Sequence, residues 1–165
     1  MKTHLLLFSC ALAIASSSFA QTKTAGSIDC DKADPMHVIQ IPDRPGFSYA
    51  ISQSKCTWTK SMTLAGIEGK EFVNTGFSET TGSSTRTTGI GVTNYGADRV
   101  YSRSTGTLDP KTLTYSGKWT FIDGTGKLRG IKGSGTYTCK AKSAEPVAGY
   151  TCESEGEYTL PAAKK

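Results

Sequence analysis

The sequence predicts an all-β protein that folds as a closed antiparallel barrel. Beyond the first 20 residues no stretch has the apolar spacing of a helix, and the chain is rich in Thr, Ser, Gly and Tyr, which suit strands and turns. Strand-like stretches alternate with turn residues at the spacing typical of a sandwich or a barrel. Several glycines fall on inward positions of neighbouring stretches, which favours the barrel because glycine lets a sheet curve tightly.

The N-terminus is typical of an exported protein. A short basic start precedes an apolar stretch at residues 5–15 and a small-residue ending at Ala20, as in a cleaved secretory signal peptide. The apolar stretch is too short for a membrane-spanning helix, which needs about 20 residues. The bulky Phe8 disfavours lipid attachment at Cys10. We therefore expect removal of residues 1–20 and a location in the periplasm or outside the cell, with no membrane span.

The remaining chain has the length of one domain. Residues 21–46 are polar and interrupted by Asp and Pro, so we expect an irregular segment there with one short strand at residues 38–41. Residues 47–165 carry a nearly continuous strand signal, which predicts that they form a single β-barrel domain.

The first long strand of this domain changes parity along its length. Tyr49 and Ile51 occupy odd positions among polar or small residues, whereas Cys56 and Trp58 occupy even ones. A β-bulge near Gln53 would keep both sets facing inward. Further strands are expected at residues 71–80, 84–95, 98–105, 112–122, 133–142 and 147–160.

The later strands have distinct apolar and polar faces. In residues 112–122 the odd positions are apolar or glycine, and the even positions through 120 are Thr, Ser or Lys. This alternation is typical of an antiparallel strand with one face on a core. The residues expected to face inward in the next two strands are Gly133, Gly135, Tyr137, Cys139 and Ala141, then Ala148, Tyr150, Cys152, Ser154, Gly156, Tyr158 and Leu160.

Four cysteines follow the signal peptide: Cys30, Cys56, Cys139 and Cys152. An even number in an exported chain predicts disulfides, and the close spacing of a zinc site is absent, so we expect no metal. Placing Cys139 opposite Cys152 in a hairpin centres the connecting loop on residues 145–146, where turn residues lie. The predicted bridges are therefore Cys139–Cys152 and, by elimination, Cys30–Cys56.

The glycines at residues 124–130 do not form a nucleotide site. Their spacing is GxGxxxG, whereas dinucleotide-binding folds need GxGxxG at the start of a helix. The glycines that follow directly after this segment also exclude a helix here. The segment Gly-Thr-Gly-Lys-Leu-Arg-Gly-Ile-Lys-Gly-Ser-Gly-Thr-Tyr at residues 124–137 instead resembles the glycine-rich hairpin of allene oxide cyclase-like barrel proteins. Small exported bacterial proteins belong to that family, and plant dirigent proteins carry a related segment.

The resemblance implies an eight-stranded antiparallel barrel with a central cavity. Family members of known activity bind a reactive apolar substrate and steer its cyclisation or coupling without a cofactor. The cysteines and residues 21–46 depart from the plant pattern, so we carry over the fold and no activity.

Three classes of function fit the sequence. The first is binding of a small apolar or aromatic molecule in the barrel, without a cofactor. The basic residues are scattered rather than clustered, which excludes a nucleic-acid site. An alternative is that aromatic rings simply fill the interior, since such a barrel is narrow enough to be packed solid. The residues expected to line a cavity are Trp58, Tyr101, Tyr115, Trp119 and Tyr137.

The second class is a cofactor-free isomerase or cyclase, and the third is a protein-interaction module. The enzyme would need a buried carboxylate or a positioned donor such as Tyr. Beyond the signal peptide the chain holds one histidine, His37, in the segment expected to be irregular. The charged residues within strands whose faces the pattern does not assign are Glu71, Glu79, Arg99 and Arg103. Nothing in the sequence predicts an oligomeric state.

Overall fold

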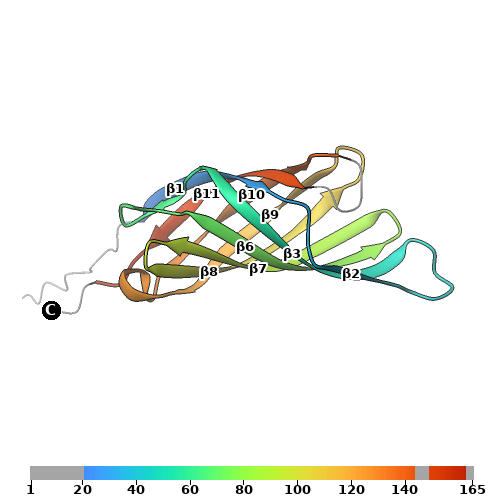
Figure 1. Ribbon diagram of the computed structural model, residues 1–165, viewed down its shortest axis with the longest axis horizontal. Coiled ribbons are helices and arrows are strands. Elements are labelled where there is room, and N and C mark those ends of the chain that lie inside the picture. The colour runs from blue at the N-terminus through green and yellow to red at the C-terminus, as the bar shows by residue number, and fades with distance from the viewer. Residues whose placement is uncertain (1–20, 144–148, 163–165) are drawn as a thin grey trace, which may run out of the picture.

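The computed structural model describes residues 21–143 and 149–162 of the chain (Figure 1). The expected signal peptide and most of the predicted loop near residue 145 lie outside these residues. The strands are β1 (Thr22–Cys30), β2 (Met36–Gln40), β3 (Phe47–Lys60), β4 (Thr63–Leu64), β5 (Ile67–Glu68), β6 (Glu71–Thr81), β7 (Ser84–Tyr95), β8 (Asp98–Asp109), β9 (Thr114–Gly124), β10 (Lys132–Ala141) and β11 (Tyr150–Thr159), with a short 3-10 helix η1 (Gly126–Leu128).

The protein is a closed, eight-stranded antiparallel barrel, as predicted. The main sheet runs in the order β1-β11-β10-β9-β8-β7-β6-β3-β2, and an additional pairing of β1 with β3 closes it. Strand β2 stands outside this ring. It pairs with the first half of β3 and projects beyond one end of the barrel (Figure 1).

The expectation of an irregular segment over residues 21–46 is wrong for its first part. Strand β1 pairs with β11 on one side and β3 on the other, so it completes the barrel wall. Its inward residues include Thr24 and Gly26, which are buried despite being small or polar. Hydrophobic periodicity therefore could not mark this strand. The short strand expected at residues 38–41 is present as β2.

The hairpin of β10 and β11 has the predicted register. Cys139 faces Cys152 and Gly135 faces Gly156. Both disulfides join the predicted partners, Cys139 with Cys152 and Cys30 with Cys56. The second bridge links β1 to β3, so a covalent bond fastens the seam at which the barrel closes.

The bulge predicted near Gln53 is absent. The pairing of β3 with β6 continues without a shift from Phe47 to Thr57. Tyr49 and Ile51 are consequently on the outer surface, with 40% and 56% of their area exposed. The inward positions of this half of β3 are Ser48, Ala50, Ser52 and Ser54. Small polar residues thus line the barrel where the sequence pattern indicated aromatic ones.

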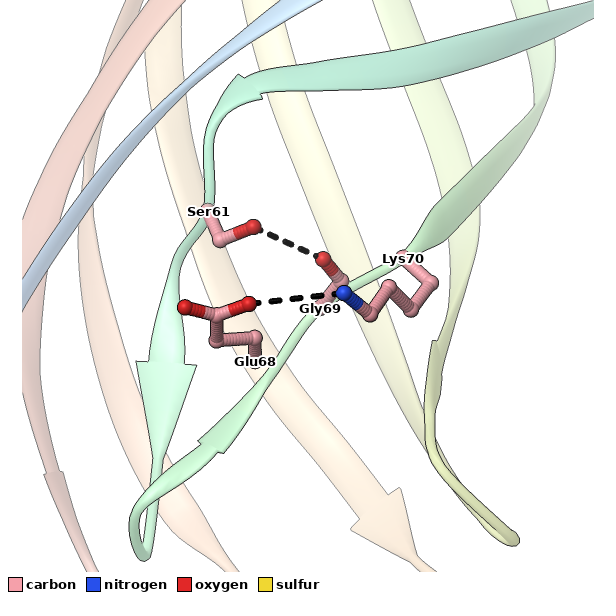
Figure 2. A network of polar contacts seen from close by, with 4 residues as sticks. All are labelled: Ser61, Glu68, Gly69 and Lys70. Atoms are coloured by element: carbon pink, nitrogen blue, oxygen red, sulfur yellow. Dashed lines mark hydrogen bonds and ion pairs between the residues drawn. The ribbon is translucent and has the colours of Figure 1, made fainter.

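One end of the barrel is packed solid. Leu64, Leu128, Ile131 and Val100 are almost completely buried there in a shared apolar cluster. The hairpin of β4 and β5 lies across this end. Figure 2 shows how its flanks are joined: the Ser61 hydroxyl donates to the carbonyl of Gly69 at 3.0 Å, beside an ion pair between exposed neighbours.

Within the part of the chain that the structure describes, no helix has both the length and the apolar character needed to cross a lipid bilayer.

Candidate functional site: the barrel cavity

A cavity of about 510 Å³ occupies the other half of the barrel. Its floor is formed by Met62, Tyr95, Trp119 and Phe121, which also belong to the packed cluster. From there it extends toward the end that carries β2 and the hairpins β6–β7 and β8–β9 (Figure 1). This volume is in the range of sites that hold small organic molecules, about 300 to 1,000 Å³. The interior is therefore not filled by its aromatic rings.

The structure brings most of the predicted binding residues to this cavity. Trp58, Tyr115, Trp119 and Tyr137 line it. Tyr101 does not, because Val100 and Ser102 on either side of it point inward and its own side chain points out. That Trp58, Tyr115, Trp119 and Tyr137 contact a ligand stays a prediction.

Two of the rings lie flat on the inner wall, over glycines. A Cβ atom on Gly135 or Gly156 would come within 2.5 Å and 2.6 Å of the Trp119 ring. A Cβ on Gly117 would come within 2.8 Å of the Tyr137 hydroxyl. The glycines therefore make space for the rings, as the alternation of small and large inward residues suggested.

The Trp119 indole N–H donates to the carbonyl of Thr136 at 3.2 Å, within the wall itself. Its polar atom is thus satisfied by the backbone and does not need a ligand. What the residue contributes to the cavity is an apolar ring surface.

Two tyrosines of this wall reach polar side chains on other strands. The Tyr137 hydroxyl is hydrogen-bonded to the side chain of Thr87 on β7. The Tyr150 hydroxyl is hydrogen-bonded to the side chains of Ser54 on β3 and Asn74 on β6. Burial raises the pKa of both phenols above the usual value, so both are neutral at physiological pH. Tyr150 was predicted to face inward on the last strand, but it was not predicted as a site residue.

The opposite wall is polar but uncharged. Strands β3, β6, β7 and β8 turn small residues toward the cavity, most of them with a hydroxyl or amide group. Among the described residues that line the cavity, none is Asp, Glu, Lys, Arg or His. The polar wall residues include Ser48, Ser52, Ser54, Asn74, Ser78, Thr80, Thr85, Thr87, Thr93, Ser102 and Ser104.

The charged residues considered as catalytic candidates lie elsewhere. Glu79 accepts a hydrogen bond from the hydroxyl of Tyr49 on the outer surface at 3.2 Å. Glu71, Arg99 and Arg103 are exposed, and none of them lines the cavity. His37 is exposed on β2. Within the described residues no group of three or more His, Cys, Asp or Glu side chains is arranged to hold a metal ion.

Comparison with known proteins identifies the architecture. No protein-family model matches the sequence, and no curated protein sequence matches it significantly. Among solved structures, the pterocarpan synthase dirigent protein GePTS1 aligns with 94% of this chain and 100% of its own, at 10% identity and a TM-score of 0.51. The fold is that of the dirigent β-barrels.

Two further solved structures are similar to this chain. The pterocarpan synthase dirigent protein PsPTS1 has 12% identity and a TM-score of 0.51, over 87% of this chain and 97% of its own. Pyocyanin demethylase has 18% identity and a TM-score of 0.41, over 79% and 98%. The two dirigent structures confirm, at the level of fold, the barrel implied by the resemblance of residues 124–137.

Proposed function

We propose that this protein is exported and binds a small, neutral, apolar or aromatic molecule in the barrel cavity. The observation that carries the proposal is the composition of the cavity wall, which combines aromatic rings with hydroxyl groups and holds no charged side chain among its described residues. Moving a charged ligand from water into such a site would cost several kcal/mol without a compensating partner. Export is supported by the N-terminal pattern and by two disulfides, which persist in oxidising compartments.

The test compares neutral and charged ligands of one shape. Naphthalene and its carboxylate and methylammonium derivatives would be titrated into the refolded or native protein by ligand-observed NMR. We expect naphthalene to bind with a measurable Kd and both charged derivatives to bind at least about tenfold more weakly, a difference of about 1.4 kcal/mol. Equal affinity for the three compounds, or no binding of any, would refute the proposal.

A substitution that fills the cavity provides the specificity control. A Cβ atom on Gly76 would have no neighbour closer than 3.6 Å, so the wall tolerates a side chain there. Gly76→Leu would project into the cavity and should abolish binding. Thr75→Leu, on the exposed outer face of the same strand, should bind like the wild type. Binding that survives in Gly76→Leu would place the ligand outside the cavity.

A cofactor-free isomerase is the second candidate, and one observation favours it. Tyr150 is a buried phenol held by Ser54 and Asn74 at the cavity wall, as a positioned hydrogen-bond donor would be. The carboxylates expected for a base, Glu71 and Glu79, lie outside. The isomerase hypothesis therefore predicts that Tyr150→Phe loses turnover of a neutral substrate while keeping its binding.

A protein-interaction module is the third candidate. Ile39, Tyr49, Ile51 and Phe77 are exposed apolar residues on the outer face of β2, β3 and β6, and the rings of Tyr49 and Phe77 stack at 5.6 Å. Strand β2 has β3 as its hydrogen-bonded neighbour and an uncovered second edge among the described residues. Sedimentation analysis of the wild type and of Ile39→Lys tests it: a self-association that this charge weakens supports an interface.

A further inference from the structure

Three tyrosine side chains enter the cavity beside the two disulfides. Tyr115, Tyr137 and Tyr150 all line the cavity, and all three pack against the cluster that contains the four cysteines of the disulfides. The register explains this grouping, because Tyr115 pairs with Cys139 of β10 and Cys139 pairs with Cys152 of β11. Tyr137 and Tyr150 each precede one of these cysteines by two positions, so they share its inward face. One part of the cavity therefore holds three phenol groups.

The three hydroxyl groups differ in what they contact. Those of Tyr137 and Tyr150 are held by side chains on β7, β3 and β6. The Tyr115 hydroxyl has no hydrogen-bond partner among the described residues. It is not a sealed polar atom either, since Tyr115 is half-buried and lines the cavity. The Tyr115 hydroxyl is therefore the one phenol of this group that water or a ligand has to satisfy.

The protonation of Tyr115 fixes the kind of group that it can bind. Burial, and after it the nearby phenol of Tyr150, raise the pKa of Tyr115 above its usual value. The side chain is consequently neutral at physiological pH and has a proton to donate. A carboxylate acceptor would meet no compensating cation among the described residues that line the cavity. The acceptor that suits this donor is a neutral oxygen, such as that of a carbonyl group.

Apolar side chains lie next to the Tyr115 ring, at the end of the barrel that carries the β8–β9 hairpin. Leu108 pairs with Tyr115 from β8, and Leu113 lies two positions before it. The backbone N–H of Ala141 donates to the carbonyl of Leu113 at 3.1 Å, which holds Ala141 beside them. Leu108, Leu113 and Ala141, here called the apolar lip, all line the cavity and are half-buried. Part of their surface is therefore open to the hydrocarbon part of a ligand.

We propose that Tyr115 selects the ligand: its hydroxyl donates a hydrogen bond to a carbonyl or other neutral oxygen, while the hydrocarbon part of the ligand packs on the apolar lip. A hydrocarbon of the same shape fits the same surface but leaves the Tyr115 hydroxyl without an acceptor, and it binds more weakly for that reason. The inference rests on the proposed binding function and adds the ligand class and the residue that recognises it.

The test uses two compounds of one shape, 2-acetylnaphthalene and 2-isopropenylnaphthalene, which differ in a C=O against a C=CH2 group. Their affinities for the disulfide-bonded protein are measured by ligand-observed NMR. In Tyr115→Phe we expect the ketone to bind about three- to tenfold more weakly, since a hydrogen bond between neutral groups changes a Kd by that much. The affinity for the alkene should stay within about twofold. The matched control Tyr101→Phe removes a hydroxyl from the outer face of β8 and should change neither affinity.

The outcomes separate this inference from the proposed function. If Tyr115→Phe weakens both compounds equally, or neither, recognition by the Tyr115 hydroxyl is wrong and cavity binding stands. If neither compound binds the wild type, both proposals fail. The Tm of Tyr115→Phe should equal that of the wild type, and a fall of several degrees would show that the hydroxyl bonds within the protein and overturn the inference. Leu108→Thr should weaken both compounds alike, and unchanged affinities would refute the role of the apolar lip.

Discussion

The wall of the barrel predicts opposite outcomes for the same substitution at two inward glycines. A Cβ on Gly135 would lie 2.0 Å from the carbonyl oxygen of Glu155 and 2.5 Å from the Trp119 ring. A Cβ on Gly76 would meet nothing closer than 3.6 Å. Alanine at Gly135 must therefore shift a backbone strand and an indole, whereas alanine at Gly76 enters open space.

The expected magnitudes follow from these contacts. Overpacking of a filled core costs about 1 to 3 kcal/mol, and the backbone clash puts Gly135→Ala at the upper end. For a chain of this size about 3 kcal/mol lowers the Tm by roughly 6 to 12 °C. Gly76→Ala should leave stability unchanged or raise it by up to about 1 kcal/mol, because alanine restricts the unfolded chain.

Thermal unfolding followed by circular dichroism, without a reducing agent so that the disulfides stay intact, measures the Tm of both variants. Thr136→Val, on the exposed outer face beside Gly135, controls for substitution in β10 as such and should change the Tm little. Equal Tm values for Gly135→Ala and Gly76→Ala would refute the assignment of filled and open regions of the wall.

Three further predictions concern the core. Peptide mapping without reduction should find Cys139 joined to Cys152, and removing this bridge, which spans 13 positions, should cost about 3 kcal/mol; a peptide joining Cys56 to Cys139 would contradict the register. Trp119→Ala should lower stability by about 3 to 5 kcal/mol, since the ring is 7% exposed and packs on Phe121; unchanged unfolding in denaturant would put it outside the core. Burial raises the pKa of Tyr95 above its ordinary value of about 10. The neutral phenol therefore contributes its full stabilisation below about pH 10, and this contribution is lost as the pH rises further. The variant Tyr95→Phe should lose less stability than the wild type at alkaline pH, and an identical pH profile of the two proteins would argue against this cause.

The sequence predicted the half of the barrel in which each strand has one apolar face. In β9, Tyr115, Trp119 and Phe121 alternate with exposed polar residues, and this period fixed the inward face. In β10 and β11 the same alternation, together with two cysteines at matching parity, also fixed the register. These strands carry most of the aromatic residues that line the cavity, so most of the aromatic site residues could be predicted from the sequence.

The other half was hidden because its inward face is polar. In β3 the cavity-facing residues include Ser48, Ser52 and Ser54, while Tyr49 and Ile51 are exposed. A rule that places apolar residues inside therefore predicts the wrong inward face for this half of the strand. The bulge was predicted only to reconcile that face with the inward positions of Cys56 and Trp58. The signal that could have located the polar wall is the alternation of Ser with larger residues, read as small-inside rather than apolar-inside.

The polarity of this wall is also what gives the cavity its volume. Small side chains on β3, β6, β7 and β8 leave space that the large rings of the opposite wall do not fill. A structural role alone would be better served by apolar residues, which pack such a space and stabilise the fold. The small hydroxyl-bearing residues of this wall fit a binding role instead.

Native mass spectrometry of the protein, isolated without denaturation from its own cell envelope or culture medium, tests the central claim most directly. We predict a fraction of molecules carrying one neutral organic molecule, which is released on unfolding and absent from Gly76→Leu prepared in the same way. The Thr75→Leu variant should retain it. Wild-type protein that never carries an adduct and takes up no neutral aromatic compound, or an adduct that persists in Gly76→Leu, would contradict the claim that the barrel cavity is a binding site.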